Sequence, residues 1–336
     1  MGEVITWMDA AHRQAVGRLQ AHCASPDARL VISGVNGWIG CAICNMLLDI
    51  DPGFWASRLY LLGSRPGVFS SSQGYRLPIM VLADPENRSR LRGKRTIVFH
   101  LAFLTKDRVP DNEPDGYFLA NAAIRNAMFH SLADSTCDNF ILASSGAVYD
   151  AINPGQDPRQ AKVGVYGKAK WDDEQATLLH FSGGPTRVHI PRIFNISGPF
   201  SNKPELYALS SFIIGALGGK EVRVKSPNLV YRSYTCLIDL LSLLFNLIST
   251  AAEVPGAVFD STCLPEIESA DLASKVIRTL GSPATLVLDH PARQTIDRYL
   301  GSTGDMLGLL TRYDQVPLEL DMQIKRMAWH IQRCSR

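Results

Sequence analysis

A tyrosine and a lysine four residues apart are the side chains of this sequence best suited to moving a proton. Tyr166 and Lys170 would share one face of a helix, because residues four apart on a helix are neighbours. A tyrosine with its usual pKa of about 10 is a poor acid–base group at neutral pH. A neighbouring ammonium favours the phenolate and lowers that pKa, so the phenol could exchange a proton with a carbonyl or hydroxyl oxygen. Ordinary surface helices often carry this spacing, so the rest of the chain must supply the context.

A serine hydroxyl is the third candidate for this chemistry. Ser145 directly follows a strand expected over residues 140–144. The carboxyl ends of the strands in a doubly wound fold border the crevice where ligands bind, so Ser145 could hydrogen-bond the reacting oxygen. The alternative is a serine that only completes a turn at the end of the strand.

A glycine-rich bend indicates a dinucleotide. A strand expected over residues 29–33 leads into Gly34, Gly37 and Gly40, and a helix is expected to follow. Glycine lets the backbone turn sharply and approach a pyrophosphate, whose charge the helix N-terminus favours. The spacing is G-x-x-G-x-x-G rather than G-x-G-x-x-G, and a bend of this kind sometimes reflects tight packing alone. Its place between the first strand and a helix favours the dinucleotide interpretation.

The end of the second expected strand bears on which dinucleotide is bound. An acidic residue there would bind the ribose hydroxyls of NAD, but this chain has Ser64 and Arg65. A guanidinium fits the extra phosphate of NADP, so NADP is favoured over NAD as the cofactor. Alternatively, Arg65 is a solvated loop charge. Asp84, at the end of the next strand, either accepts from the adenine amino group or serves the turn before Pro85.

These residues require a parallel sheet to bring them together. Short apolar strands alternate with helices through the first part of the chain, and such strands do not alternate polar and apolar residues. This pattern is typical of a parallel sheet buried on both faces. It predicts an α/β fold with a Rossmann-type doubly wound parallel sheet. The strands are expected at 29–33, 59–62, 79–82, 96–101, 140–144 and 188–193, and the main helices at 38–48, 115–133 and 166–180.

The predicted organisation has three parts. Residues 1–28 are expected to form an N-terminal helical extension, and residues 29–194 the NAD(P)-binding Rossmann domain, rejoined by about 235–260. After Asn195 glycine, proline and serine interrupt the rhythm, although helices are expected near 205–217 and 237–250. Residues 195–336 are therefore expected to be mostly a smaller, mixed α/β substrate-binding lobe.

The charge balance and the apolar stretches exclude two broad classes. The chain of 336 residues has 34 Lys plus Arg and 32 Asp plus Glu, a formal net charge of +2. Dedicated nucleic-acid binders usually have a strong basic surplus, so nucleic acid is not expected as a partner. The longest apolar stretch, residues 237–248, is interrupted by Asp239, Ser242 and Asn246 and is shorter than the ~20 residues a membrane span needs. No membrane partner is expected.

The cysteines and the N-terminus indicate a location. Seven scattered cysteines predict reduced thiols in a cytoplasmic protein. Cys41 and Cys44 form a C-x-x-C without a second pair, so no metal site is expected. The N-terminus carries Glu3 and Asp9 and lacks a basic-then-apolar start, so no secretory signal is expected.

Taken together, these motifs resemble the extended short-chain dehydrogenase/reductase group, the NAD(P)-dependent epimerase/dehydratase family that acts mainly on nucleotide sugars. The resemblance is collinear from about residue 29 to 330. Besides the glycine bend and the Tyr/Lys pair, it is carried by Val98–Ala102, Asn121, Ser144–Tyr149, Pro191–Pro199, Tyr231–Tyr234 with Asp239, and Arg298–Tyr299.

The resemblance implies roles for individual residues. Ser145, Tyr166 and Lys170 would be the catalytic triad, with Tyr166 as proton donor or acceptor. Lys170 would hold the nicotinamide ribose and lower the pKa of Tyr166, and Asn121 would act structurally behind the site. The expected cofactor-binding residues are Gly34, Asn36, Gly37, Trp38, Ile39, Gly40, Ser64, Arg65, Asp84, Leu101, Ala102, Phe103, Asn121, Tyr166, Lys170 and Phe194.

The resemblance also implies a substrate and a partner. Ser145 would bind the substrate at its reacting oxygen, and Asn195, Arg232 and, more weakly, Arg298 fall where the family contacts a nucleotide diphosphate. For Arg232 the alternative is an ordinary surface arginine. Family members commonly form homodimers through the helices that carry Asn121 and Tyr166, so a homodimer is expected.

Departures from the family pattern narrow the activity. Gly146 and Ala147 replace the acidic pair of the sugar dehydratases, so dehydration is disfavoured. Phe103 is bulkier than the usual residue, and Asp150 replaces a glycine. Arg65 favours a nucleotide-sugar ketoreductase that consumes NADPH, whereas the serine-rich block favours an epimerase that retains its cofactor. The alternatives are a reductase of a non-nucleotide carbonyl compound and a non-catalytic dinucleotide sensor.

Overall fold

The computed structural model describes residues 6–109, 114–152, 161–250 and 256–334. The chain divides into two compact units. The first unit comprises Val16–Ile193 and Leu244–Phe259, and the second comprises Met1–Ala15, Phe194–Leu243 and Asp260–Arg336. The functions assigned to the sequence-based domains, 29–194 and 195–336, stay predictions.

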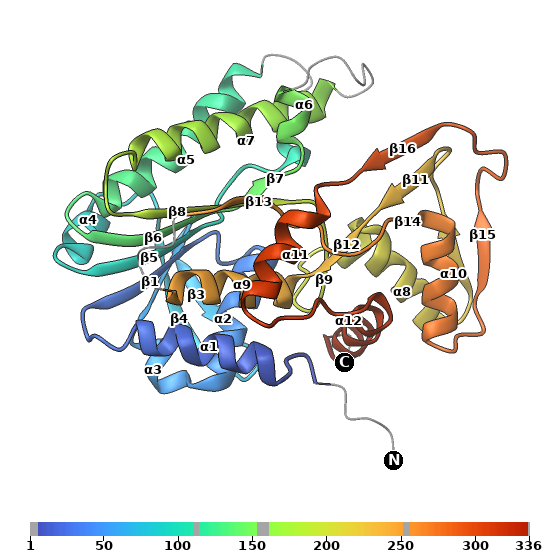
Figure 1. The fold of residues 1–336 in the computed structure, drawn as a ribbon, viewed down its shortest axis with the longest axis horizontal. Coiled ribbons are helices and arrows are strands. Elements are labelled where there is room, and N and C mark those ends of the chain that lie inside the picture. Colours follow the sequence, from blue (N-terminus) through green and yellow to red (C-terminus); the bar gives the residue numbers. More distant parts are fainter. Residues whose placement is uncertain (1–5, 110–113, 153–160, 251–255, 335–336) are drawn as a thin grey trace. The chain divides into compact units, whose positions relative to one another are not determined.

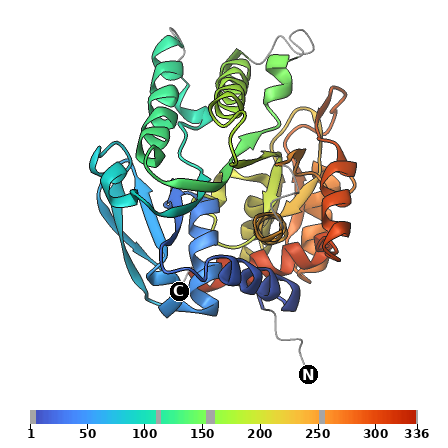
Figure 2. The same ribbon diagram turned by 60° about the vertical axis from the view of Figure 1, so that its left-hand side comes forward.

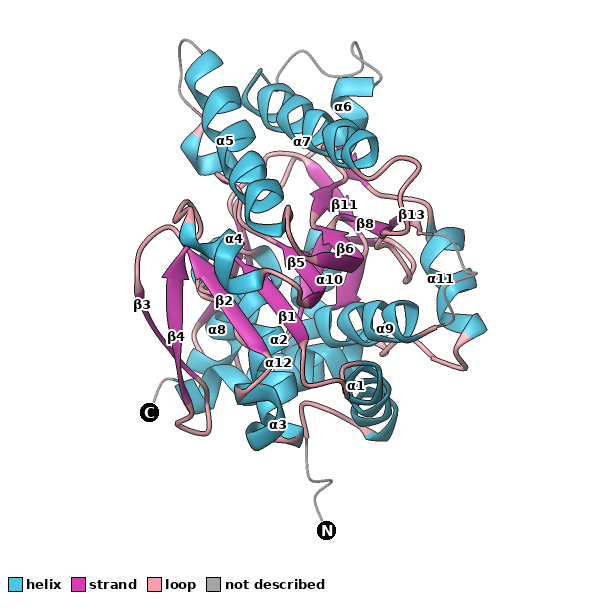
Figure 3. Cartoon of the chain, turned by 90° about the vertical axis from the view of Figure 1, so that its left-hand side faces the viewer, coloured by secondary structure: helices cyan, strands magenta, loops and turns pink. Residues whose placement is uncertain are grey.

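The first unit is built on one large sheet. Its strand order is β13-β8-β6-β5-β1-β2-β4-β3, and β7 pairs with β8. The pairs formed by β1, β2, β4, β5, β6, β7 and β8 are parallel, and β3 joins the edge antiparallel to β4; Figure 3 shows the strands side by side. The strands are β1 (Ala28–Ser33), β2 (Leu59–Gly63), β3 (Gly67–Ser70), β4 (Arg76–Val81), β5 (Arg95–His100), β6 (Thr136–Leu142), β7 (Ser144–Ser145), β8 (Arg187–Ile193) and β13 (Val258–Asp260).

Helices cover both faces of this sheet. Figures 1 and 2 show α5 (Asp115–Leu132) and α7 (Ala161–His180) side by side over one face, and Figure 1 shows α2 (Trp38–Ile50) over the other. The predicted doubly wound α/β fold is therefore confirmed. The remaining helices of this unit are α3 (Pro52–Ala56), α4 (Glu86–Leu91), α6 (Val148–Ile152) and the short 3-10 helix Lys106–Arg108.

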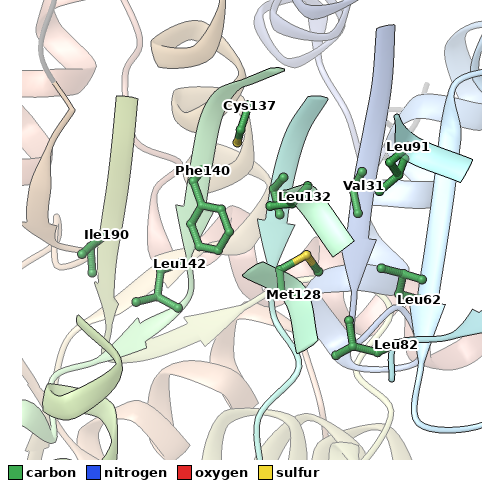
Figure 4. Close-up of a cluster of buried hydrophobic side chains, with 11 residues drawn as sticks. Val31, Leu62, Leu82, Leu91, Met128, Leu132, Cys137, Phe140, Leu142 and Ile190 are labelled. Carbon is green, nitrogen blue, oxygen red and sulfur yellow. The ribbon is translucent and has the colours of Figure 1, made fainter. Parts of the chain in front are cut away.

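Apolar strand residues explain why the sheet is buried. On the α5 side, Met128 and Leu132 of α5 pack on Val31, Val98 and Phe140 of three neighbouring strands, as Figure 4 shows in part. All five side chains are buried. Burial on two faces accounts for short apolar runs such as Leu30–Ile32 of β1 and Ile97–Phe99 of β5. The packed layer fixes the strand ends, where the candidate residues lie.

The second unit consists of small sheets and helices. β9 (Asn195–Ser197) pairs with β12 (Tyr234–Cys236), and β10 (Glu221–Val224) pairs with β15 (Thr285–Leu288). A third sheet has the order β14-β11-β16. Its strands and the helices of this unit are β11 (Leu229–Arg232), β14 (Ile267–Glu268), β16 (Ile296–Tyr299), α8 (Ala208–Gly218), α10 (Ser269–Thr279), α11 (Thr303–Arg312), α12 (Leu320–Cys334) and the 3-10 helix Pro204–Leu206.

The first turn of the N-terminal helix belongs to a buried charge network of the second unit. His12, in α1 (Ala10–His22), lies 2.7 Å from Asp239 at the start of α9 (Leu237–Ser249) and 2.9 Å from Asp9. Arg326 of α12 lies 3.2 Å from Asp9. Burial alone would lower the pKa of His12, but hydrogen bonds and charges of Asp239 and Asp9 outweigh it and raise that pKa. The predicted extension is thus tied to residues far along the chain.

In the described ranges, no helix has both the length and the apolar character that crossing a bilayer demands.

Candidate active site

The glycine bend after β1 is a close-packed turn in which side chains do not fit. Gly34 has a φ of +74°, and a Cβ there would lie 2.8 Å from the amide nitrogen of Ala102. A Cβ on Gly40 would lie 2.7 Å from the Cα of Val35. Glycine is therefore required at both positions. The bend runs directly against the segment that follows β5.

The start of α2 is suited to an anion. Its N-cap is Gly37, which makes no side-chain cap, and the first turn of the helix contains no acidic residue. The amide of Gly37 donates to the carbonyl of Gly34 over 2.9 Å, which holds the bend in place. A helix N-terminus reached through a glycine turn attracts phosphate, so these residues fit the pyrophosphate of a dinucleotide.

Buried polar groups shape the segment after β5. The hydroxyl of Ser33 accepts hydrogen bonds from the amides of Leu101 (3.1 Å) and Ala102 (3.2 Å) and contacts Nδ1 of His100 at 2.8 Å. Burial lowers the pKa of His100 to about 3, with the charge of Lys170 acting in the same direction, so the imidazole is neutral. His100 therefore serves to join β1 and β5.

Asn121 lies behind the same segment. Its side-chain oxygen accepts from the amide of Leu104 at 2.8 Å, and its amide nitrogen donates to the carbonyl of Tyr117 at 3.0 Å. The side chain is buried. These contacts attach the post-β5 segment to α5 and agree with the structural role expected for Asn121.

The end of β2 presents exposed polar side chains. Ser64 and Arg65 are both exposed, and Arg65 forms no ion pair with any residue that the structure describes. Asp84 is differently placed: its carboxylate accepts from the amide of Glu86 at 3.0 Å and lies 3.2 Å from Arg90. These are the contacts of a turn residue, and a contact between Asp84 and adenine stays a prediction.

The helix that carries Tyr166 closely approaches the loop that follows Ser145. The loop after β7 is held by the amide of Gly146, which donates to the carbonyl of Ile193 at 3.0 Å, and Ser145 Oγ accepts from the amide of Ala147 at 3.2 Å. A Cβ on Gly167 would lie 2.1 Å from the carbonyl oxygen of Ala147. The helix turn that carries Tyr166 therefore rests directly on the loop that follows Ser145.

Lys170 lies one turn further along α7 and is buried. Its Nζ donates to the carbonyl of Ala143 at 2.7 Å and lies 3.6 Å from the ring centroid of Phe103. Burial lowers the pKa of Lys170 to about 8, against the charges of Asp173 and Glu174. The ammonium is therefore the main form at neutral pH. The ring of Phe103 also meets that of Tyr166 edge-on, with centroids 5.8 Å apart.

The first unit thus connects several of the predicted catalytic and cofactor residues through direct contacts. Gly34 packs on Ala102, Phe103 packs on Tyr166 and Lys170, and Lys170 bonds the end of β6 next to Ser145. Residues predicted from four separate sequence segments therefore lie along one edge of the sheet, where the parallel strands end.

An ion-pair network that the sequence analysis missed supports this edge. Glu174 of α7 is buried, pairs with Arg192 of β8 at 2.8 Å, and accepts a hydrogen bond from Ser144. Arg192 also donates to the hydroxyl of Tyr149 at 3.1 Å. The sequence shows only that Glu174 follows Lys170 by four residues on one helix face; its partners Arg192 and Ser144 belong to other segments.

The second unit contains a cavity of about 280 Å³, and three of the predicted residues, Phe194, Asn195 and Arg232, line it. The side-chain nitrogen of Asn195 is buried and has no hydrogen-bond partner among the described residues. Arg232 is paired with Asp297 at 3.0 Å. Tyr234, from the Tyr231–Tyr234 motif, also lines it, whereas Tyr207 and Ser210 were not indicated by the sequence.

Arg298 lies apart from this cavity. It neighbours Arg232 across the β11–β16 pair, but the register places Arg232 opposite Tyr299 and Arg298 opposite Tyr231. Since successive residues of a strand face opposite sides, Arg232 and Arg298 face opposite sides of this sheet. Arg298 is exposed and pairs with Glu266 at 3.1 Å.

Comparisons with known proteins bear on this arrangement. A UDP-glucose 4-epimerase of Rhizobium meliloti (strain 1021) is 25% identical to this chain over 236 residues, which cover 64% of this chain and 68% of that protein. The solved UDP-glucose 4-epimerase of Thermotoga maritima, with UDP-glucose, has a TM-score of 0.68 at 17% identity, covering 92% of this chain and 100% of that one.

A second solved structure has the same fold. The UDP-glucuronic acid 4-epimerase of Bacillus cereus, in complex with UDP-glucuronic acid and NAD, has a TM-score of 0.67 at 16% identity and covers 91% of this chain and 99% of that one. The model of the family described as "NAD dependent epimerase/dehydratase family" matches residues 30–259, which is more than half of the chain. The resemblance stated from the motifs is therefore confirmed, and this chain belongs to the NAD dependent epimerase/dehydratase family.

Proposed function

We propose that this protein is a nicotinamide-dependent enzyme that transfers hydride at a carbon of a nucleotide-diphosphate sugar, with epimerisation as the leading reaction. The observation that carries the proposal is the contact chain from the glycine bend through Phe103 to Tyr166 and Lys170. The relatives named above are 4-epimerases, which supports interconversion of two sugars. Arg65 supports a ketoreductase as the second candidate.

Tyr166 would exchange the proton at the sugar oxygen while the bound nicotinamide exchanges hydride with the carbon. Lys170 would favour the phenolate of Tyr166, because a charged ammonium on the same helix face stabilises a negative oxygen. Ser145 would hydrogen-bond the same sugar oxygen. Gly146 and Ala147 stand where the sugar dehydratases have an acidic pair, and neither has a carboxylic acid, which is consistent with a reaction without loss of water.

The cavity of the second unit is proposed to hold the nucleotide diphosphate. The buried nitrogen of Asn195 is a donor without an acceptor in the described part of the chain, and such groups are costly unless a ligand satisfies them. Arg232 uses Nη1 and Nη2 on Asp297 and on backbone carbonyls. A guanidinium has five donors, so Nε and the second Nη2 hydrogen remain for phosphate oxygens. A contact between Arg298 and the substrate stays a prediction.

For the cofactor, we propose NADP over NAD. The support is the exposed guanidinium of Arg65 at the end of β2, which pairs with no described carboxylate, together with the lack of an acidic residue there.

The predicted homodimer is supported by apolar side chains exposed on α5 and α7, among them Leu119 and Leu179. The proposed cytoplasmic location is supported by free thiols at Cys23, Cys41, Cys44, Cys137, Cys236 and Cys263.

The redox balance of the reaction tests the proposed function. The purified protein is incubated with UDP-sugars in the presence of NADP+ or NAD+, and separately with UDP-4-keto sugars in the presence of NADPH or NADH, and the products are separated by chromatography. Interconversion of two sugars without net change in the cofactor identifies an epimerase, and stoichiometric NADPH consumption identifies a ketoreductase. Hydride transfer to simple ketones alone would contradict the nucleotide-sugar substrate.

The variant Tyr166→Phe tests the assigned acid–base group. Removal of the hydroxyl should lower turnover by a factor of about 10² to 10⁴, the usual contribution of a general acid–base group. Binding of the reduced cofactor, followed by its fluorescence, should stay close to that of the wild type. Turnover that survives in this variant would reject the role of Tyr166.

A further inference from the structure

The ammonium of Lys170 is buried without a carboxylate beside it among the described residues. The side chain is 6% exposed, and its Nζ has two contacts in those ranges: the carbonyl of Ala143 at 2.7 Å and the ring of Phe103 at 3.6 Å. A buried ammonium normally requires a charged partner, because burial penalises the charged form. The carbonyl of Ala143 and the ring of Phe103 must therefore supply most of the stabilisation that water would give to the charged form of Lys170.

The nearest carboxylates are engaged elsewhere. Asp173 pairs with Arg125 of α5 at 2.8 Å, and Glu174 pairs with Arg192 of β8 at 2.8 Å. Each carboxylate is thus largely neutralised by its own guanidinium. Their charges act on Lys170 over a distance but form no ion pair with it in the described part of the chain.

The ring of Phe103 is held firmly against Lys170. It packs edge-on against Tyr117 (centroids 6.3 Å apart) and against Tyr166 (5.8 Å). The residues on either side are tied down, since the amide of Ala102 donates to Ser33 and the amide of Leu104 to Asn121. The ring therefore cannot turn away without breaking several contacts.

We propose that Phe103 is a positioning residue that keeps Lys170 charged, with the face of its ring acting in place of a counter-ion. The electron-rich face of an aromatic ring attracts a cation within about 6 Å, and more strongly where water is excluded. The inference rests on the proposed roles of Tyr166 and Lys170. The inference assigns a role to Phe103, which is bulkier than the residue usual at this position of the family.

The ring also sets the geometry of the pair. One N–H of Lys170 is directed to Ala143 and one to the ring, which leaves the third of its three donors for another partner. Because Phe103 touches both Tyr166 and Lys170, it fixes the separation between phenol and ammonium. The charged and titratable groups around Lys170 are His100 of β5, Arg125 of α5, Arg192 of β8, and Tyr166, Asp173 and Glu174 of α7.

The test compares Phe103→Leu, which keeps an apolar side chain but has no aromatic face, with Phe103→Tyr, which keeps the face. The titration of Lys170 is followed by the ¹³Cε chemical shift of labelled lysine, assigned with Lys170→Met. Loss of the ring should lower the pKa of Lys170 by roughly half a unit to one and a half units, and Phe103→Tyr should restore it. The basic limb of the pH–rate profile should shift in the same direction.

The outcomes separate this inference from the proposed function. An unchanged Lys170 titration in Phe103→Leu, in protein whose thermal unfolding shows that it is folded, overturns the inference even if turnover falls. If the pKa of Lys170 is lowered in Phe103→Leu but the wild-type protein transfers no hydride to any nucleotide sugar, the inference is supported and the proposed function is rejected. If Phe103→Leu does not fold, Phe103→Met is titrated instead, with the same expectation.

Discussion

Lys170 and His100 are both buried bases beside the same loop, but only one of them keeps its proton at neutral pH. Burial lowers the pKa of both, to about 8 for Lys170 and to about 3 for His100. The starting values differ by several units, so the same penalty leaves lysine charged and histidine neutral. His100 therefore forms a hydrogen bond with Ser33, and Lys170 carries the charge that is proposed to act on Tyr166.

Arg65 is the residue on which the cofactor preference is predicted to depend. Arg65→Ala should weaken NADPH binding about tenfold and leave NADH binding nearly unchanged, because only NADPH has the 2′-phosphate that a guanidinium can bind. Dissociation constants from the fluorescence of each reduced cofactor measure the effect. Arg65→Lys, which keeps the charge, should lose less. An equal loss for both cofactors would show that Arg65 acts on the loop rather than on the phosphate.

At the scale of elements, the approach of α7 to the β7 loop depends on one glycine. Gly167→Ala would place a methyl group 2.1 Å from the carbonyl oxygen of Ala147, so the helix must move away from the loop. The unfolding free energy should fall by about 1–3 kcal/mol, the usual cost of overpacking. Turnover should fall further than cofactor affinity, since Tyr166 moves relative to Ser145.

The same helix provides a matched control. A methyl group on Gly164 would have no atom of the described residues within 4 Å outside its own helix turn, so Gly164→Ala meets no obstacle there. Alanine at this position should stabilise the helix by roughly 0.5–1 kcal/mol, because glycine is a poor helix residue. Denaturant unfolding of both variants gives the comparison. Similar effects of the two substitutions would mean that α7 tolerates contact with the loop.

The elements that could be predicted from the sequence are those marked by a local pattern of residue types. The strand Ala28–Ser33 contains the apolar run Leu30–Ile32, whose side chains are all buried because both faces of the sheet are covered, and the glycine bend is marked by residue type. β3 was missed, since only Phe69 of its four residues is buried. The Glu174–Arg192–Ser144 network and the tight fit of Gly167 were missed because both depend on contacts between distant segments.

The same distinction applies to the candidate site. Tyr166, Lys170 and Ser145 were indicated by spacing and by their place at strand and helix ends. The cavity of the second unit was indicated only in part: Asn195, Arg232 and Tyr234 lie in the motifs, but Tyr207 and Ser210 carry no local signal. Arg298 and Arg232 face opposite sides of their sheet because of the register between β11 and β16, and that register cannot be read from the sequence.

For the molecule as a whole, the buried charge network of the N-terminal segment predicts a pH dependence of stability. The pKa of His12 is raised in the folded protein. A raised pKa means that the fold binds the proton more tightly than the unfolded chain does. The stabilisation is therefore complete below the unfolded value of about 6.5 and is lost as the pH rises through the folded value.

The measurement is the thermal midpoint of wild type and His12→Gln between pH 5.5 and 8.5. The difference between them should be largest at the acid end and shrink with rising pH. His22, on the same helix, is the control, because burial lowers its pKa and its contribution changes with pH in the opposite direction. A difference that does not vary with pH would mean that His12 is not protonated in the fold.

The same network links chain positions that are separated by most of the chain. His12 and Asp239 are 227 residues apart, and Asp9 and Arg326 are 317 residues apart. Because a ribosome makes the polypeptide from its N-terminus, Asp9 and His12 emerge long before their partners exist. Asp9 and His12 can pair with each other at once, but the contacts that join them to the rest of the fold form only after residues 239 and 326 have been made. His12 can reach Asp239 once that residue has been made, and Asp9 can reach Arg326 only later.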